Sequence, residues 1–134
     1  MRSLRVAQSA LRCSELRVVN LLPLASADIR GVAEVGLLSG VWKDGRLAIE
    51  ALLDSVDEVI FAWGVSPVRG PANGHLSLQI EWVREEARRR NLRTWTLGGQ
   101  PRHPSRWHQY LSDVHGRTNG GTFQERVRDQ LLAT

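Results

Sequence analysis

The chain has 134 residues, a net charge of +4 and one cysteine. This length suits one domain, the lone Cys13 excludes an internal disulfide, and no apolar run is long enough for a membrane span or a signal peptide. We therefore expect one cytoplasmic domain over residues 1–134. All basic residues except Lys43 are arginine, which favours a nucleotide or nucleic-acid partner, although a GC-rich genome would encode the same usage.

Two elements are predicted near the start of the chain. Apolar residues at helical spacing predict an amphipathic helix over residues 3–15. Residues 16–24 are rich in leucine and valine and contain Pro23 near their end, which is typical of a buried parallel strand. Asn20 is the polar exception in this run, so its amide either ties down a neighbouring loop or faces a ligand.

The next part of the chain is predicted to alternate helix and strand. Glycines restrict residues 25–40 to a short helix and a loop. A core-packed helix follows, from residue 42 or 44 to 56, and residues 57–66 form a buried strand that contains Trp63-Gly64. The buried face of this helix is predicted to comprise Leu47, Ile49, Leu52, Leu53 and Val56.

A long helix and a third strand are predicted after a turn-rich stretch at residues 67–74. Apolar residues at helical spacing predict the helix over residues 76–90, with Asn91 as a left-handed cap. The arginines at 88–90 suit the solvated C-terminal end of a helix. Residues 92–97 are predicted as a strand.

The chain is predicted to close with a helix. Thr122 and Glu125 have the spacing of a capping box at its start. Its buried stripe is predicted to comprise Phe123, Val127 and Leu131.

Strands that alternate with helices predict an α/β fold. We expect a three-layer sandwich with a small, mostly parallel sheet and helices on both faces. Ligands of open parallel sheets bind at the carboxyl ends of the strands. Asn20, Trp63-Gly64 and the loop of residues 98–108 lie at or near such ends, so we expect these three segments to converge.

The loop of residues 98–108 is the candidate site. Gly98 and Gly99 allow backbone conformations closed to other residues, and Pro104 holds His103 extended. The residues predicted to bind a ligand are Asn20, Trp63, Gly64, Gly98, Gly99, His103, Pro104 and Ser105. The residues predicted to bind phosphate or nucleic acid are Arg102, Arg106, Trp107 and His108.

Several kinds of chemistry can be compared for this loop. Trp107 or Tyr110 offers a face on which a base could stack, whereas Asp113 and Glu125 could simply pair with the loop's cations. The spacing of the histidines fits no zinc pattern, so we expect no metal and no cofactor. Ser105 lacks the Gly-x-Ser-x-Gly elbow of a hydrolase, which leaves a small hydrolase as the least favoured hypothesis.

Three runs of sequence carry a resemblance to a known family. The runs are V-V-N-L-L-P-L at 18–24, V-I-F-A-W-G at 59–64 and L-G-G-Q-P-R-H-P-S at 97–105. In this order they resemble the bacterial and phage family called domain of unknown function 1643, over nearly the whole chain. More distantly, the Asn, the Trp-Gly and the His-Pro-Ser segments look like the uracil-DNA glycosylase superfamily.

The second resemblance implies roles for individual residues. Asn20 would read a flipped base, His103 would donate a hydrogen bond to a base carbonyl, and Pro104 with Ser105 would face DNA. The superfamily's water-activating motif has no match in this chain, so we expect no base excision.

The first resemblance bears on assembly and function. Relatives begin with a strand and an Asn-Pro-Ser segment, and we expect this chain to lack both. A missing strand exposes a sheet edge, which predicts a homodimer or a larger homo-oligomer. We predict a protein that binds a nucleobase, a nucleotide or DNA, and a non-catalytic phage or prophage interaction module is the alternative.

Overall fold

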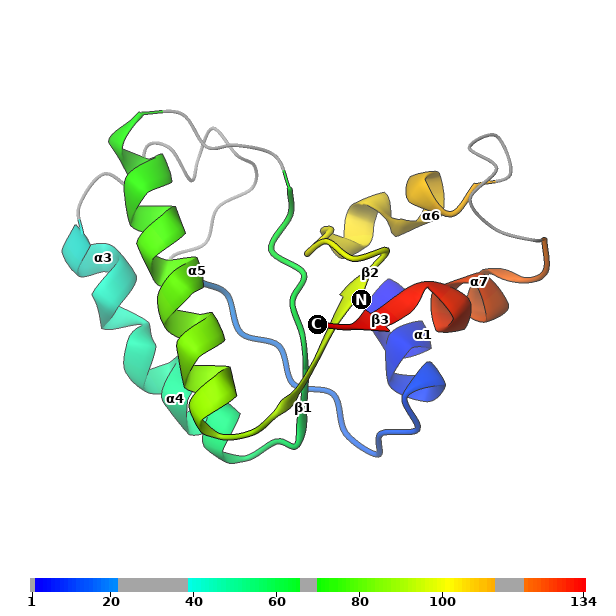
Figure 1. Ribbon diagram of the computed structural model, residues 1–134, viewed down its shortest axis with the longest axis horizontal. Coiled ribbons are helices and arrows are strands. Elements are labelled where there is room, and N and C mark those ends of the chain that lie inside the picture. Colours follow the sequence, from blue (N-terminus) through cyan, green and yellow to red (C-terminus); the bar gives the residue numbers. More distant parts are fainter. Residues whose placement is uncertain (1, 22–38, 66–69, 113–119) are drawn as a thin grey trace. The chain divides into compact units, whose positions relative to one another are not determined.

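The computed structural model describes residues 2–21, 39–65, 70–112 and 120–134. The chain forms two compact units (Figure 1). Unit 1 consists of Met1–Arg17, Ile60–Val65 and Arg93–Thr134, and unit 2 consists of Val18–Val59 and Ser66–Leu92. Two units of one domain and two separate domains would both give this division, so the single domain stays a prediction.

Each unit has its own helices. Those of unit 1 are α1 (Arg2–Ala10), the 3-10 helix η1 (Pro104–Arg106), α6 (Trp107–Tyr110) and α7 (Phe123–Gln130). Those of unit 2 are α3 (Ser39–Asp44), α4 (Arg46–Asp54) and α5 (Pro71–Arg89). The strands are β1 (Glu58–Ile60), β2 (Arg93–Leu97) and β3 (Leu131–Ala133). Over the described residues, the helices are all too short or too polar to cross a membrane.

The strands form one small sheet in the order β1-β2-β3. β2 confirms the strand predicted at residues 92–97, whereas β1 covers only the beginning of the strand predicted at 57–66. β2 pairs antiparallel with β3, with Leu97 opposite Leu131. Helices combined with a sheet are consistent with the predicted α/β class. The predicted mostly parallel sheet and three layers are not confirmed, since the β2–β3 pairing is antiparallel.

The last strand corrects the sequence prediction, which continues the closing helix to Leu131. The helix ends at Gln130, and Leu131 has extended backbone angles, φ −73° and ψ 111°. Leu131 keeps the helical spacing of Phe123 and Val127, so periodicity alone cannot separate the two conformations. Leu131 is extended because it pairs with Leu97 of β2, and its side chain is still buried in this conformation.

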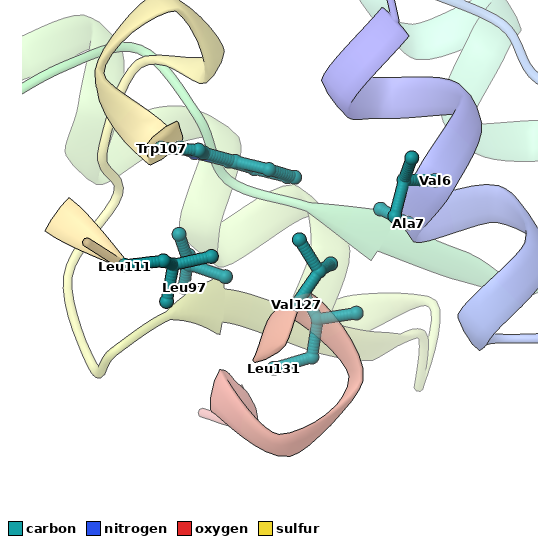
Figure 2. Packing of buried hydrophobic residues seen from close by; sticks show 7 residues of the cluster. All are labelled: Val6, Ala7, Leu97, Trp107, Leu111, Val127 and Leu131. Carbon is teal, nitrogen blue, oxygen red and sulfur yellow. The ribbon is translucent and has the colours of Figure 1, made fainter. Parts of the chain in front are cut away.

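The core of unit 1 draws side chains from both ends of the chain (Figure 2). Its buried members are Val6, Ala7, Leu97, Trp107, Leu111, Val127 and Leu131. The helix α1 contacts α7 directly, and α1 also contacts η1. These contacts place the residues that follow β2 against the same core as the first helix.

The buried strand predicted at residues 16–24 is not present over its described part, residues 16–21. Val18 and Val19 are 53% and 39% exposed, and Asn20 is exposed as well. A fully buried strand needs hydrogen-bonding neighbours and cover on both faces, which an apolar sequence alone does not supply. Residues 22–24, and residues 25–38 of the predicted loop, lie outside the described residues.

The first helix is shorter than the predicted 3–15 because the chain reverses at Arg12. Arg12 has φ +58°, its N–H donates to Ser9 O at 3.1 Å, and Cys13 N–H donates to Gln8 O at 3.1 Å. This pair of hydrogen bonds and a left-handed residue form the helix-ending arrangement that glycine usually adopts. Arginine gives no such signal in the sequence.

The helix predicted up to residue 56 is divided in two at Gly45. Ile49 and Leu53 of α4 are buried as predicted, but Leu47 is 78% exposed. Successive helical residues turn by about 100°, so Leu47 lies about 200° from Ile49 and faces away from the buried side. The predicted face was therefore too broad.

The long helix α5 begins at Pro71, within the stretch predicted as a turn, and ends close to its predicted end. Gly70 precedes Pro71, which lies in the first turn of the helix, where proline is well tolerated. At the other end Asn91 has φ +55°, which confirms the left-handed cap. Both α3 and α4 contact α5 within unit 2.

A buried amide joins the segments of unit 2. The side chain of Gln79 on α5 is fully buried; its Nε2 donates to Leu21 O at 3.1 Å and to Trp42 O at 3.0 Å. Its Oε1 accepts from Arg46 Nε at 3.0 Å, and the Arg46 guanidinium lies 4.6 Å from the centre of the Trp82 ring. Buried polar groups need such partners to avoid a desolvation cost.

The predicted capping box at the start of α7 is confirmed. Glu125 N–H donates to Thr122 Oγ1 at 3.2 Å, and Thr122 N–H donates to Glu125 Oε1 at 3.4 Å.

Thr122→Ala should lower the free energy of unfolding by about 1 kcal/mol, because it removes the cap acceptor of α7. Urea denaturation followed by circular dichroism measures the change. Thr122→Ser keeps the hydroxyl and should behave nearly like the original chain, and an equal loss in both variants would contradict a capping role.

Candidate functional site

The segment after β2 begins with a tight reversal at two glycines. Gly98 and Gly99 have φ +67° and +85°, and an antiparallel bridge joins Leu97 to Gln100. Gly98 N–H donates to Gln130 O at 2.8 Å, which fastens the reversal to the end of α7. As the sequence predicts, both glycines use backbone conformations that other residues rarely adopt.

His103 is held extended, as predicted, and caps η1. Its φ and ψ are −64° and 137°, and its Nδ1 accepts from Ser105 N–H at 3.2 Å. Ser105 Oγ lies 2.8 Å from the same nitrogen. An Nδ1 that accepts from a backbone N–H leaves Nε2 as the ring nitrogen that can donate. Both side chains are exposed, so this Nε2–H can donate to a ligand.

Part of the predicted convergence is present within unit 1. Gly64 N–H donates to Pro101 O at 2.7 Å, and Gly64 has φ +101°. A Cβ added at Gly64 would lie 3.7 Å from His103 Cβ, so the end of the Trp-Gly run lies beside the His-Pro-Ser segment. Trp63 is half-buried, and its ring centre lies 4.9 Å from that of Phe61.

Asn20 belongs to unit 2 and is exposed. Its predicted proximity to His103 therefore stays a prediction. Pro104 and Ser105 occupy η1, so Ser105 sits in a short helix and not in a strand-to-helix elbow.

Two arginines of this segment have no ion pair among the described residues, namely Arg102 and Arg106. The guanidinium of Arg102 lies over the Tyr110 ring, 3.8 Å from its centre. Arg106 is exposed, and its Nη1 is 3.5 Å from Gln109 Oε1. We call Arg102, His103, Ser105 and Arg106 the loop cluster.

The arginines at the end of α5 behave differently. Arg88 pairs with Glu85, Arg89 pairs with Glu86 at 3.2 Å, and Arg90 pairs with Glu86 at 2.6 Å. Arg90 also pairs with Asp54 at 2.7 Å, and the hydrogen bonds that its guanidinium donates to Asp54 and Glu86 raise the pKa of Arg90 above its usual value. These contacts agree with the predicted helix end, because each charge has an intramolecular partner.

Trp107 does not fit the predicted role of a stacking face. Its side chain is 0% exposed, and its Nε1 donates to Arg102 O at 2.9 Å. The ring lies in the core of unit 1, at the residue that directly follows η1 (Figure 2). His108 is exposed, and its ring stacks on Phe123 with the ring centres 3.7 Å apart.

The alternative prediction is that Asp113 and Glu125 form ion pairs with the cations of the loop. Of these two acidic residues, the structure describes only Glu125. Glu125 serves the capping box of Thr122 and pairs with neither loop arginine. Asp113 and His115 lie outside the described residues. Over the described stretches, no three His, Cys, Asp or Glu side chains are grouped closely enough to hold a metal ion.

Comparison with known proteins identifies a family for this chain. A family model described as "Protein of unknown function (DUF1643)" matches residues 1–105. That range contains Asn20, Gly64 and the loop up to Ser105, whereas α6, α7 and β3 follow it. No curated protein and no solved structure matches the chain.

Proposed function

We propose that this chain, which belongs to the DUF1643 family, binds a phosphate-bearing ligand, either a nucleotide or a nucleic acid, through the loop cluster. One observation carries the proposal. Arg102 and Arg106 lack a carboxylate partner among the described residues, whereas the three arginines at the end of α5 are all paired. Unpaired guanidinium groups on one short segment favour an external anion.

The histidine and serine of the cluster add further hydrogen-bonding groups. His103 Nε2–H is an exposed donor whose tautomer is fixed by the Ser105 backbone. A phosphate has acceptor oxygens on every side, so it could accept from this donor and from a guanidinium together. His108 lies two residues beyond Arg106 and is exposed as well.

A finer proposal follows the resemblance to the uracil-DNA glycosylase superfamily. In it Asn20 and His103 contact a base, next to Trp63, Gly64 and the glycine reversal, at the carboxyl ends of a mostly parallel, three-layer sheet. The proximity of Gly64 to His103 supports the half of this arrangement that lies in unit 1. Homodimer formation and a cytoplasmic location also stay predictions.

Arg106→Gln and Arg102→Gln should each weaken binding of single-stranded DNA about 10-fold, the effect of losing one charge-assisted hydrogen bond. Fluorescence anisotropy of a fluorescein-labelled strand, repeated over a series of salt concentrations, measures the dissociation constant. The salt slope should fall by about one for each lost phosphate contact.

Arg88→Gln provides the charge-matched control. It removes the same net charge from a side chain that is already paired with Glu85, so binding should change less than about 2-fold. Equal effects in all three variants would contradict a site at the loop cluster. If neither single-stranded nor duplex DNA, nor ATP, binds at low salt, the non-catalytic interaction module is the better hypothesis.

A further inference from the structure

We infer that Arg102 is an oriented phosphate-binding residue and that Tyr110 is the positioning residue that fixes its guanidinium plane. This inference rests on the proposed function and gives it a specific geometry. Arg102 would bind phosphate with its guanidinium held in one orientation, whereas Arg106 would contribute only an exposed positive charge.

The contact with Tyr110 is what orients the guanidinium. Its carbon lies 3.8 Å from the centre of the Tyr110 ring, and its Nε is buried without a hydrogen-bond partner in the described structure. Arg102 also has no ion pair there. Of its side-chain nitrogens only Nε is both buried and unpartnered, so Nη1 and Nη2 reach solvent. An aromatic face therefore sets the plane, and the two outer nitrogens keep their donors for a ligand.

Both ends of this stack are anchored. Arg102 N–H donates to Gln100 O at 2.7 Å, and Arg102 O accepts from the buried Trp107 Nε1 at 2.9 Å. Tyr110 is pressed against the reversal at Gly98, because a Cβ added at Gly98 would fall 2.3 Å from Tyr110 Oη. Neither the backbone of Arg102 nor the ring of Tyr110 can shift without disturbing the core or the turn.

This geometry distinguishes arginine from lysine. A guanidinium held in one plane presents two parallel N–H donors that match two oxygens of a phosphate, whereas an ammonium is a flexible point charge. Arg106 has no comparable support among the described residues, where its guanidinium makes only the 3.5 Å hydrogen bond to Gln109 Oε1. Lysine should therefore replace Arg106 well and Arg102 poorly.

The test compares substitutions that conserve charge. Arg102→Lys should weaken binding of labelled single-stranded DNA about 10-fold, as much as Arg102→Gln does, whereas Arg106→Lys should change it less than about 2-fold. Tyr110→Leu should also weaken binding about 10-fold with no change in charge, and Tyr110→Phe, which keeps the aromatic face, should bind more tightly than Tyr110→Leu. If ATP is the ligand that binds, the same order should hold with ATP.

Circular dichroism and thermal melting of each variant guard against a folding defect. Should Tyr110→Leu fail to fold, Arg102→Lys decides the question, because it leaves the ring and the turn intact. An Arg102→Lys variant that binds as tightly as the original chain, while Arg102→Gln binds poorly, would overturn the oriented fork and leave the proposed function standing. If Arg102→Gln itself matches Arg88→Gln, the loop cluster is not the site.

Discussion

Trp107→Ala should lower the free energy of unfolding by about 3–5 kcal/mol, the range measured when a large buried aromatic side chain is removed. Trp107 is 0% exposed and lies among Leu97, Leu111 and Val127 in the core of unit 1 (Figure 2). The substitution leaves a cavity that this small core cannot easily close, and it also frees the Arg102 carbonyl from its indole partner. Urea denaturation followed by circular dichroism at 222 nm gives the change.

Two control variants show whether the loss of stability comes from removing a buried ring. Trp107→Phe keeps an aromatic ring but loses the indole N–H, so we expect a smaller loss of about 1–2 kcal/mol. Leu47→Ala removes an exposed side chain of α4 and should change stability by less than about 0.5 kcal/mol. If Trp107→Ala were as mild as Leu47→Ala, the ring would not be a core residue, and its prediction as a stacking face would regain support.

Gly98→Ala should be far more damaging than Gly99→Ala, although the two glycines are adjacent and both have positive φ. A Cβ at Gly98 would lie 2.3 Å from Tyr110 Oη and 2.6–2.7 Å from two ring carbons, whereas a Cβ at Gly99 would meet no atom within 4 Å. Left-handed backbone alone costs an alanine about 1–2 kcal/mol, which is the loss expected at Gly99. Displacement of the ring should raise the loss at Gly98 to about 2–4 kcal/mol.

The variants Gly98→Ala and Gly99→Ala should also differ in their effect on DNA binding. If Tyr110 orients Arg102, then Gly98→Ala should weaken DNA binding about as much as Tyr110→Leu, and Gly99→Ala should leave it within about 2-fold. Urea denaturation and fluorescence anisotropy on the same preparations measure both effects. Equal stability losses at the two positions would mean that the Tyr110 ring moves aside freely and holds nothing in place.

Features set by neighbouring residues could be predicted from the sequence. Asn91 ends α5 in a left-handed conformation, and Thr122 with Glu125 caps α7, because each of these arrangements involves residues within one helical turn. The extended His103 and the reversal at Gly98 and Gly99 belong to the same class, since proline and glycine restrict or free the backbone directly.

Features that depend on contacts with residues far away in the sequence could not be predicted from local patterns. Residues 16–21 are apolar enough for a buried strand but do not form one, and Leu131 leaves the helical pattern because β2 offers a partner. The stack of Arg102 on Tyr110 follows no helical or strand spacing, because the chain between them passes through η1 and the first turn of α6. The sequence of this segment indicates a candidate site, but spacing alone does not predict that Trp107 is buried and that Tyr110 contacts Arg102.

The contact between α1 and α7 has a consequence for how the protein is made. Val6 and Ala7 on α1 are buried in a core that also needs Val127, which the ribosome adds about 120 residues after Ala7. At roughly 5–20 residues per second, the apolar side of α1 waits about 6–23 s for α7 to be translated. Throughout that interval the nascent chain presents an amphipathic helix whose apolar side is not yet covered, and a surface of this kind is prone to aggregation.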